Sequence, residues 1–190
     1  MITERYSDKK LAEITIGERK KWNSTIILTD YDSTWPLRFK EIERIIRKVL
    51  GDMILLLEHV GSTSVPGLSA KPIIDIVLEI QNSTKESNYV PALESKEFKL
   101  RIREPDWYEH RLLKITDANL HVFSANCMET ERMLKFRDWL RSNPDDKMLY
   151  QTKKVELSKK VWKYRQNYAD AKTAVIQEIL AKVDSCEGDG

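Results

Sequence analysis

Two apolar strands joined by a glycine- and hydroxyl-rich loop constrain this chain more than any other feature of its sequence. Strands are predicted over Met53 to Leu57 and over the β-branched run Ile73 to Ile80, because short apolar runs of this kind are typical of strands buried in a sheet. The loop between them contains Gly61, Gly67 and three consecutive hydroxyl residues, Ser62, Thr63 and Ser64. Glycine permits backbone conformations that a β-carbon forbids, and hydroxyls beside exposed amides can hold a phosphate. We therefore expect a phosphate-binding loop at this turn.

The second strand carries two acidic residues on one face. Side chains alternate along a strand, so Asp75, Val77 and Glu79 point the same way. An ionised carboxylate among apolar neighbours is costly unless a cation or a donor offsets it. Asp75 and Glu79 are therefore the candidate catalytic and metal-binding acids. The structural alternatives are that backbone groups or Arg111 satisfy Asp75, and that Glu79 lies at the solvent end of its strand.

A later strand, predicted over 119–123, offers two more polar candidates on one face. Asn119 and His121 share that face. His121 is a candidate ligand or general base, and Asn119 a candidate ligand-binding residue, since an imidazole exchanges protons near neutral pH. A lone histidine more often donates to a carbonyl of the core, and this alternative stays open.

Three cationic residues are candidates for binding an anionic ligand. Lys71 follows the loop, and Arg111 ends the crowded charged segment 103–111, which no helix or strand pattern requires. Lys154 lies on a basic helix. Arginine suits bidentate contact with an anion, but Arg111 could instead pair with an acid of its own segment. Lys71 and Lys154 could equally be surface lysines.

Length and composition predict one globular domain over 24–183, with an N-terminal arm over 1–23 and a disordered tail over 184–190. The chain has 190 residues, a charged fraction of 33% and a hydrophobic fraction of 41%, which are ordinary for a globular protein. A net charge of +2 creates no overall field that would favour a membrane or nucleic-acid partner. Two cysteines, Cys127 and Cys186, and the absence of a long apolar run predict a cytoplasmic protein.

The remaining periodicity predicts an α+β fold with a C-terminal helical segment. An apolar stripe that includes Trp35 and Phe39 predicts a helix ending at Gly51. Further strands are expected over 24–30, 98–102, 110–115 and 119–123, and further helices over 90–96, from Met128, over 144–165 and over 168–183.

The string from Glu58 to Leu68, continued by Lys71 to Ile76, resembles the GrpB family. The resemblance covers about 30–183, and its other segments are Tyr31-Asp32 with Trp35 and Phe39, Arg103 to Arg111, Asn119 to Ser124, Phe136 to Arg141 and Asn167 to Lys172. It implies a nucleotidyltransferase-like mixed sheet flanked by helices. In that superfold the loop holds a triphosphate and the strand acids hold magnesium. A similar domain is attached to dephospho-CoA kinase in some bacteria.

The sequence departs from the nucleotidyltransferase pattern at the acids. Val77 stands where active members place a second acid, and the strand expected to supply a third offers Asn119 and His121. Two-metal phosphoryl transfer needs several hard oxygen ligands. The chain is therefore predicted to hold one magnesium ion or none.

Three functions are compatible with these residues. The first is metal-assisted transfer of a nucleotidyl group to an unidentified acceptor, with Ser62 holding phosphates and Asp75 the metal. The second is a module that binds a nucleotide or coenzyme without turnover, which Val77 favours. The third is an RNA-binding accessory protein, which rests only on the basic helix and on Trp107 or Tyr108. We expect a small anionic or nucleotide-like ligand, no membrane partner, and no nucleic-acid partner as the favoured case.

Overall fold

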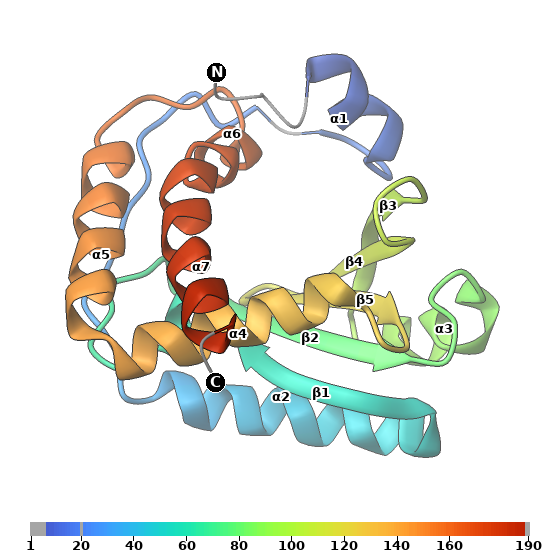
Figure 1. Cartoon of the computed structure of the whole chain (residues 1–190). Coiled ribbons are helices and arrows are strands. Elements are labelled where there is room, and N and C mark those ends of the chain that lie inside the picture. Colours follow the sequence, from blue (N-terminus) through green and yellow to red (C-terminus); the bar gives the residue numbers. More distant parts are fainter. Residues whose placement is uncertain (1–6, 20, 189–190) are drawn as a thin grey trace.

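The computed structural model describes residues 7–19 and 21–188, and its centre is one mixed β-sheet (Figure 1). The strand order is β1-β2-β5-β4-β3. The strands of the sheet are β1 (Ile54–Val60), β2 (Ile74–Ile80), β3 (Lys99–Glu104), β4 (His110–Lys114) and β5 (Ala118–Ser124). Strands β2 and β5 are parallel, whereas the other neighbouring pairs are antiparallel. The α+β class with a mixed sheet is thereby confirmed.

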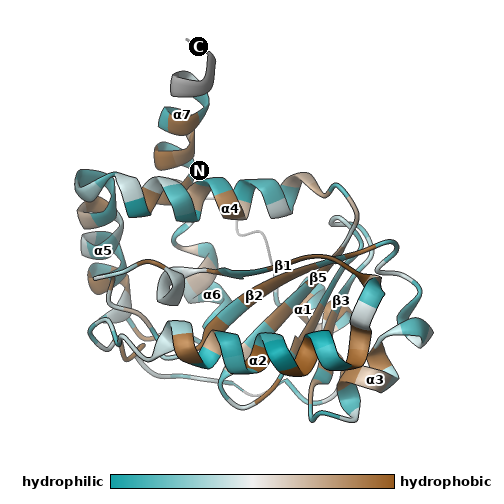
Figure 2. Cartoon of the chain, turned by 90° about the horizontal axis from the view of Figure 1, so that it is seen from below, coloured by the Kyte–Doolittle hydropathy of each residue, from teal (hydrophilic) through white to brown (hydrophobic). Residues whose placement is uncertain are grey.

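One face of the sheet is covered by α2 (Trp35–Leu50) and α3 (Val90–Glu94). The predicted stripe of α2 is buried, including Ile42 and Ile46, and packs against Ile76 and Leu78 of β2. Figure 2 shows this amphipathic helix lying along the strands, with α4 on the other side of them. Because the apolar residues of β2 at even positions face α2, Asp75, Val77 and Glu79 face the opposite side.

The second face is only partly covered by helices. Helix α4 (Met128–Ser142) packs its Met133 and Leu134 against Val77 and Phe123. The other elements on that side are α1 (Asp8–Ile14), α5 (Pro144–Ser158), α6 (Arg165–Asp170) and α7 (Thr173–Gly188). In Figure 1, α5, α6 and α7 lie to the left of β3 and β4. A small apolar cluster joins α4, α5 and α7 to Val65 and Leu68 of the glycine-rich loop. The C-terminal helices are thus anchored directly on the predicted phosphate loop.

The C-terminal helices differ from their predicted bounds. The helix expected over 144–165 ends at Ser158, and the one expected over 168–183 is divided between α6 and α7. The segment 159–164 does not continue as helix because it pairs with a segment near the N-terminus. The amide of Trp162 donates to Ser24 O at 3.0 Å. The strand expected over 24–30 is present only as isolated bridges.

The domain bounds remain predictions. The expected tail over 184–190 begins inside α7, which continues to Gly188. Residues 1–6 and 20 of the arm, and 189–190 of the tail, lie outside the described residues, as does the Cys186 side chain. None of the helices described is long and apolar enough to cross a membrane.

Candidate functional site

A carboxylate in contact with an amide and an imidazole lies on the second face of the sheet. Asp75 of β2 is in register with Asn119 of β5, and Asn119 Nδ2 donates to Asp75 Oδ1 at 2.8 Å. His121 Nε2 lies 3.9 Å from the same oxygen, and the Asp75 side chain is 32% exposed. Burial alone would raise the pKa of Asp75, but the contacts with His121 and Asn119 outweigh it and lower that pKa. The structure therefore brings three predicted site residues together around an ionised carboxylate.

The glycine-rich loop approaches this carboxylate at Gly61. Gly61 has φ +69°, and a β-carbon built on it would lie 2.6 Å from Asp75 Oδ2. Only a glycine combines this backbone conformation with such a close approach. The predicted proximity of the loop and Asp75 is thus present in the fold.

Replacing Gly61 by alanine is expected to lower the free energy of unfolding by about 1–3 kcal/mol, because a positive φ is strained for alanine and its β-carbon would displace Asp75. Chemical denaturation measures the loss. Gly67→Ala is the matched control, since Gly67 also has a positive φ but a β-carbon there meets only the end of the Lys147 side chain. Equal losses at the two glycines would show that the contact with Asp75 contributes nothing.

Only one of the three loop hydroxyls faces the site. Ser62 is half-buried and is hydrogen-bonded to the Tyr150 hydroxyl, whose pKa burial raises to about 12. Thr63 is buried and donates to Ile73 O at 3.1 Å, and Ser64 donates to Gly61 O at 2.6 Å. Thr63 and Ser64, both predicted to bind a ligand, therefore hold the loop in shape instead.

Three lysines from separate parts of the chain, Lys71, Lys114 and Lys172, lie close enough to the Asp75 carboxylate for their charges to interact with it. The pKa of Lys71 is lowered to about 8, first by burial and then by Lys172, whereas Asp75 acts in the opposite direction. Burial likewise lowers the pKa of Lys172, against the influence of Asp75. Lys114 is in register with Asn119; it is an exposed residue, yet desolvation of its ammonium group lowers its pKa. The sequence had singled out Lys71 and Lys154 but neither Lys114 nor Lys172.

Lys154 is the most deeply buried of these lysines. It is 2% exposed, donates to Ser69 O, and forms no ion pair with a carboxylate in the described part of the chain. Burial, followed by the positive charges of Lys172 and Lys71, lowers its pKa to about 6. A buried ammonium without a paired carboxylate is costly. This position therefore suits a group that becomes charged when an anion arrives.

Tyr168 adds an unsatisfied donor beside the lysines. It is 1% exposed, and its hydroxyl has no hydrogen-bond partner among the described residues. The ammonium nitrogens of Lys71 and Lys172 lie 5.4 and 5.1 Å from its ring centroid. Buried polar groups are normally hydrogen-bonded, so the orphaned hydroxyl indicates a missing partner. Neither Tyr150 nor Tyr168 could be identified from the sequence, because both read as apolar helix positions.

Glu79, predicted as a catalytic and metal-binding acid, has a structural role in this fold. Its carboxylate accepts from the amides of Asn126 at 3.2 Å and Cys127 at 3.1 Å, at the start of α4. Four residues separate it from Asp75 along β2, which places the two about 13 Å apart. The structure therefore does not bring the two predicted acids together.

Glu79→Ala is expected to lower the free energy of unfolding by about 1–2 kcal/mol, because two amides at the N-terminus of α4 would lose their acceptor. Glu79→Gln retains one acceptor oxygen and should lose less. Thermal denaturation of both variants checks the order, and a greater stability of the alanine variant would contradict the capping role.

Arg111, predicted to bind an anion, lies on the opposite face of the sheet. It alternates with His110 along β4, is 5% exposed, and its Nε contacts Glu86 Oε1 at 2.5 Å. Arg103 pairs with the same carboxylate. The predicted alternative, an ion pair between Arg111 and an acidic residue, is present. The acid is Glu86, however, which lies outside the segment 103–111.

The donors around Asp75 suit an anion better than a divalent cation. Magnesium is usually held by one or two carboxylates together with phosphates, and of the two predicted acids, Asp75 and Glu79, Asp75 alone lies at this position. Its Oδ1 already accepts from Asn119, and positive charges surround it. Residues 7–19 and 21–185 contain no group of three or more histidine, cysteine or acidic side chains that could bind a metal. The expected magnesium site therefore does not fit this arrangement.

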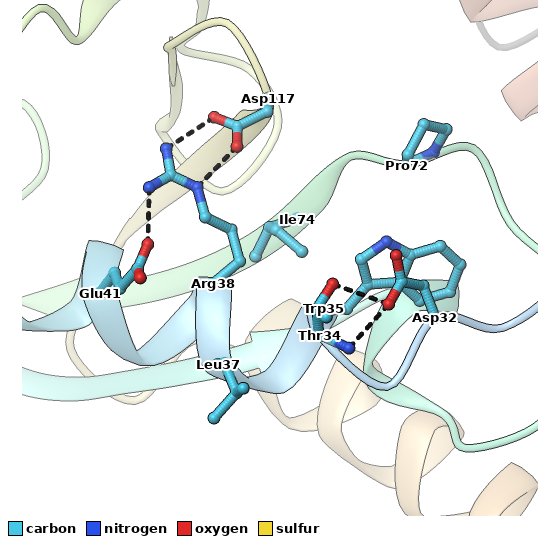
Figure 3. A pocket seen from close by; sticks show the side chains of 9 residues that line it. All are labelled: Asp32, Thr34, Trp35, Leu37, Arg38, Glu41, Pro72, Ile74 and Asp117. Carbon is cyan, nitrogen blue, oxygen red and sulfur yellow. Dashed lines mark hydrogen bonds and ion pairs between the residues drawn. The ribbon is translucent and has the colours of Figure 1, made fainter.

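A separate pocket of about 420 Å³ lies at the start of α2, on the first face (Figure 3). Its charged groups are already paired: Arg38 contacts Asp117 at 2.6 Å and Glu41 at 3.0 Å, and Asp32 accepts from Thr34. Figure 3 shows these partners pointing toward one another. The pocket therefore offers a ligand few unsatisfied groups, unlike the region around Asp75.

Comparisons with known proteins identify relatives over most of the chain. The sequence profile described as "GrpB protein" matches residues 25–182. A UPF0157 protein of Halalkalibacterium halodurans is 51% identical over 94% of this chain and 93% of its own length. A UPF0157 protein of Streptomyces coelicolor is 40% identical over 82% of each. The crystal structure of the conserved protein GrpB from Enterococcus faecalis has a TM-score of 0.67 at 28% identity, covering 80% of this chain and 98% of that one.

Proposed function

The chain belongs to the GrpB family, and from that premise and the geometry around Asp75 we propose that it is a binding module for a nucleotide- or coenzyme-like ligand. The phosphates of the ligand are bound by lysines without a metal ion. The lysines concerned are Lys71, Lys114, Lys154 and Lys172, with Ser62 and the orphaned hydroxyl of Tyr168 as additional donors.

One observation supports this proposal above the others: three lysines lie near a single carboxylate, and a fourth, the buried Lys154, lies beside two of them. Such a cluster carries more positive charge than Asp75 compensates; the pKa values of Lys71 and Lys154 are lowered first by burial and then by the neighbouring lysine charges. A polyphosphate would compensate it through charge-assisted hydrogen bonds, which are the stronger kind. Before the ligand binds, the negative charge of Asp75 partly compensates the positive charges of these lysines.

Nucleotidyl transfer is the second candidate, and the shared environment of Ser62 and Asp75 favours it. Both residues interact with the Tyr150 hydroxyl, Ser62 by a hydrogen bond and Asp75 through its charge. The two candidates differ in what can be measured. Transfer requires added magnesium and releases pyrophosphate, whereas the binding module does neither.

Titration calorimetry with ATP, coenzyme A and pyrophosphate, each with magnesium and with EDTA, tests the proposal. Saturable binding of equal affinity in both conditions is expected, together with no pyrophosphate release from ATP. Binding of none of the three probes by the folded protein would refute the module. Magnesium-dependent pyrophosphate release that Asp75→Asn abolishes would establish the second candidate instead.

The cellular setting follows the same proposal. Cys127 is a free, half-buried thiol, which suits a reducing compartment, and nucleotides and coenzymes are cytoplasmic metabolites. We therefore propose a cytoplasmic protein with a small-molecule ligand and without a nucleic-acid partner.

A further inference from the structure

Two hydrogen bonds link Glu104, His110 and His121 across three strands of the sheet, and His121 in turn faces Asp75. Glu104 of β3 lies 2.7 Å from His110 Nδ1, and His110 Nε2 lies 3.1 Å from His121 Nδ1. His121 Nε2 then faces Asp75 Oδ1 at 3.9 Å. Glu104 and His110 are 5% and 2% exposed. A buried acid thus contacts the ligand site through two imidazoles.

The neighbouring aromatic rings leave these imidazoles little freedom to rotate. The His110 ring stacks on the His121 ring with centroids 5.2 Å apart and on the Phe123 ring at 4.9 Å. Trp107 packs edge-on against His110 at 5.1 Å. The ring orientations are therefore set by packing, and the position of each ring proton is set by the hydrogen bonds.

The hydrogen-bond partners determine which ring nitrogen of each histidine carries the proton. An ionised Glu104 can only accept, so the proton of its contact belongs to His110 Nδ1. A neutral His110 then accepts at Nε2, so His121 must donate from Nδ1. With Nδ1 committed, Nε2 is the one His121 nitrogen left to face Asp75 and a ligand.

We propose that Glu104 and His110 are positioning residues that fix the tautomer of His121, so that its Nε2 is presented to an anionic oxygen of the ligand beside Asp75. This inference deepens the proposed function and rests on it. Additional protonation at Nε2 creates an imidazolium, and the chain then places Glu104 behind that charge and Asp75 in front of it. His121 thereby becomes a charge-assisted donor to a phosphate.

The charged groups that face the histidine pair come from several elements. Among the described residues, Asp75 of β2 faces His121, with Lys71 near that carboxylate. On the other side, Lys10 of α1 lies close enough to Glu104 for their charges to interact.

Nitrogen-15 NMR of histidine-labelled protein tests the inference, because the chain has three histidines. His59 is the internal reference, since burial lowers its pKa to about 4 and its ring contacts Thr63 instead. At high pH, His110 and His121 are both expected as the Nδ1–H tautomer, which an unconstrained imidazole populates less than Nε2–H. A His121 found as the Nε2–H tautomer would overturn the proposal, and this measurement needs no variant.

Glu104→Gln provides the second measurement. A glutamine amide can donate as well as accept, so the variant is expected to reduce the Nδ1–H population of His121, to leave the His59 tautomer unchanged, and to weaken ATP binding severalfold. Glu94→Gln, the same change at an exposed position of α3, is the matched control. An unchanged His121 tautomer population in folded Glu104→Gln would overturn the positioning role. Loss of ATP binding in the wild type would refute the proposed function, while the tautomer assignment would stand by itself.

Discussion

Replacing Lys154 by methionine is expected to weaken ATP binding about 10- to 100-fold while raising the stability of the ligand-free protein. A hydrogen bond to a charged group contributes about 1.5–3 kcal/mol, which corresponds to this range of affinity. Without a ligand, the Lys154 ammonium is buried among Lys71 and Lys172 and has no paired carboxylate within the described residues. Replacing such a group by an apolar one of similar length stabilises a protein by about 1–4 kcal/mol. Binding and stability are therefore expected to change in opposite directions.

Lys153→Met is the matched control for this substitution. Lys153 is the adjacent residue of α5, but its ammonium pairs with Glu156 at 2.8 Å and its side chain is 39% exposed. Its removal should leave ATP affinity within about twofold, since surface ion pairs contribute little. Calorimetry gives the affinities and chemical denaturation gives the stabilities. If Lys154→Met bound ATP as tightly as the control, the buried lysine would have no part in recognising phosphate.

ATP affinity is expected to fall about tenfold per pH unit above pH 6, because binding takes up one proton at Lys154. The direction of the change in affinity follows from the pKa of Lys154 in the free and in the ligand-bound protein. In the free protein the pKa of Lys154 is about 6, so the group is mostly neutral at pH 7. A bound phosphate favours the ammonium and raises that pKa, so between the two pKa values binding takes up about one proton and becomes about tenfold weaker with each pH unit. The fall continues until the pKa of Lys154 in the complex is reached, and Lys71, with a pKa of about 8, adds to it above that pH.

Calorimetry in two buffers of different ionisation enthalpy counts the protons taken up. Lys154→Met should lose about one proton of uptake at pH 7, whereas the ionisation of the ligand's own phosphate is common to both proteins. The ligand-free wild type should become more stable between about pH 6 and pH 10, because the unfolded chain binds the proton that Lys154 releases on folding. Equal proton uptake by the two proteins would contradict the assignment of Lys154 as the titrating group.

The local elements of the site were largely predictable. The apolar runs of β1 and β2, the apolar stripe of α2 and the glycine of the loop each depend on neighbours within a few residues. Alternation along β2 correctly placed Asp75 and Glu79 on one face. The pairing of Asp75 with Asn119 was not predicted, because it depends on which strands are adjacent in the sheet.

The roles within the site were less predictable, because they depend on distant partners. Glu79 was predicted as a metal ligand, but it accepts from amides 47 and 48 residues away. Arg111 was predicted to bind an anion, but its partner Glu86 lies on the other face of the sheet. Thr63 and Ser64 have the same side-chain chemistry as Ser62, and only the path of the loop turns them inward.

The sequence by itself determined the strand-loop-strand unit, the face on which Asp75 lies and the family of the chain, since these depend on periodicity and on an uninterrupted motif. The tertiary structure alone decided that Lys71, Lys114 and Lys172 lie near that carboxylate, that Lys154 lies beside two of them, and that a buried glutamate reaches it through two histidines. The physical reason is that these groups come from elements up to about a hundred residues apart. Their pKa values and tautomers are set by burial and by neighbouring charges that exist only once the helices have packed against the sheet.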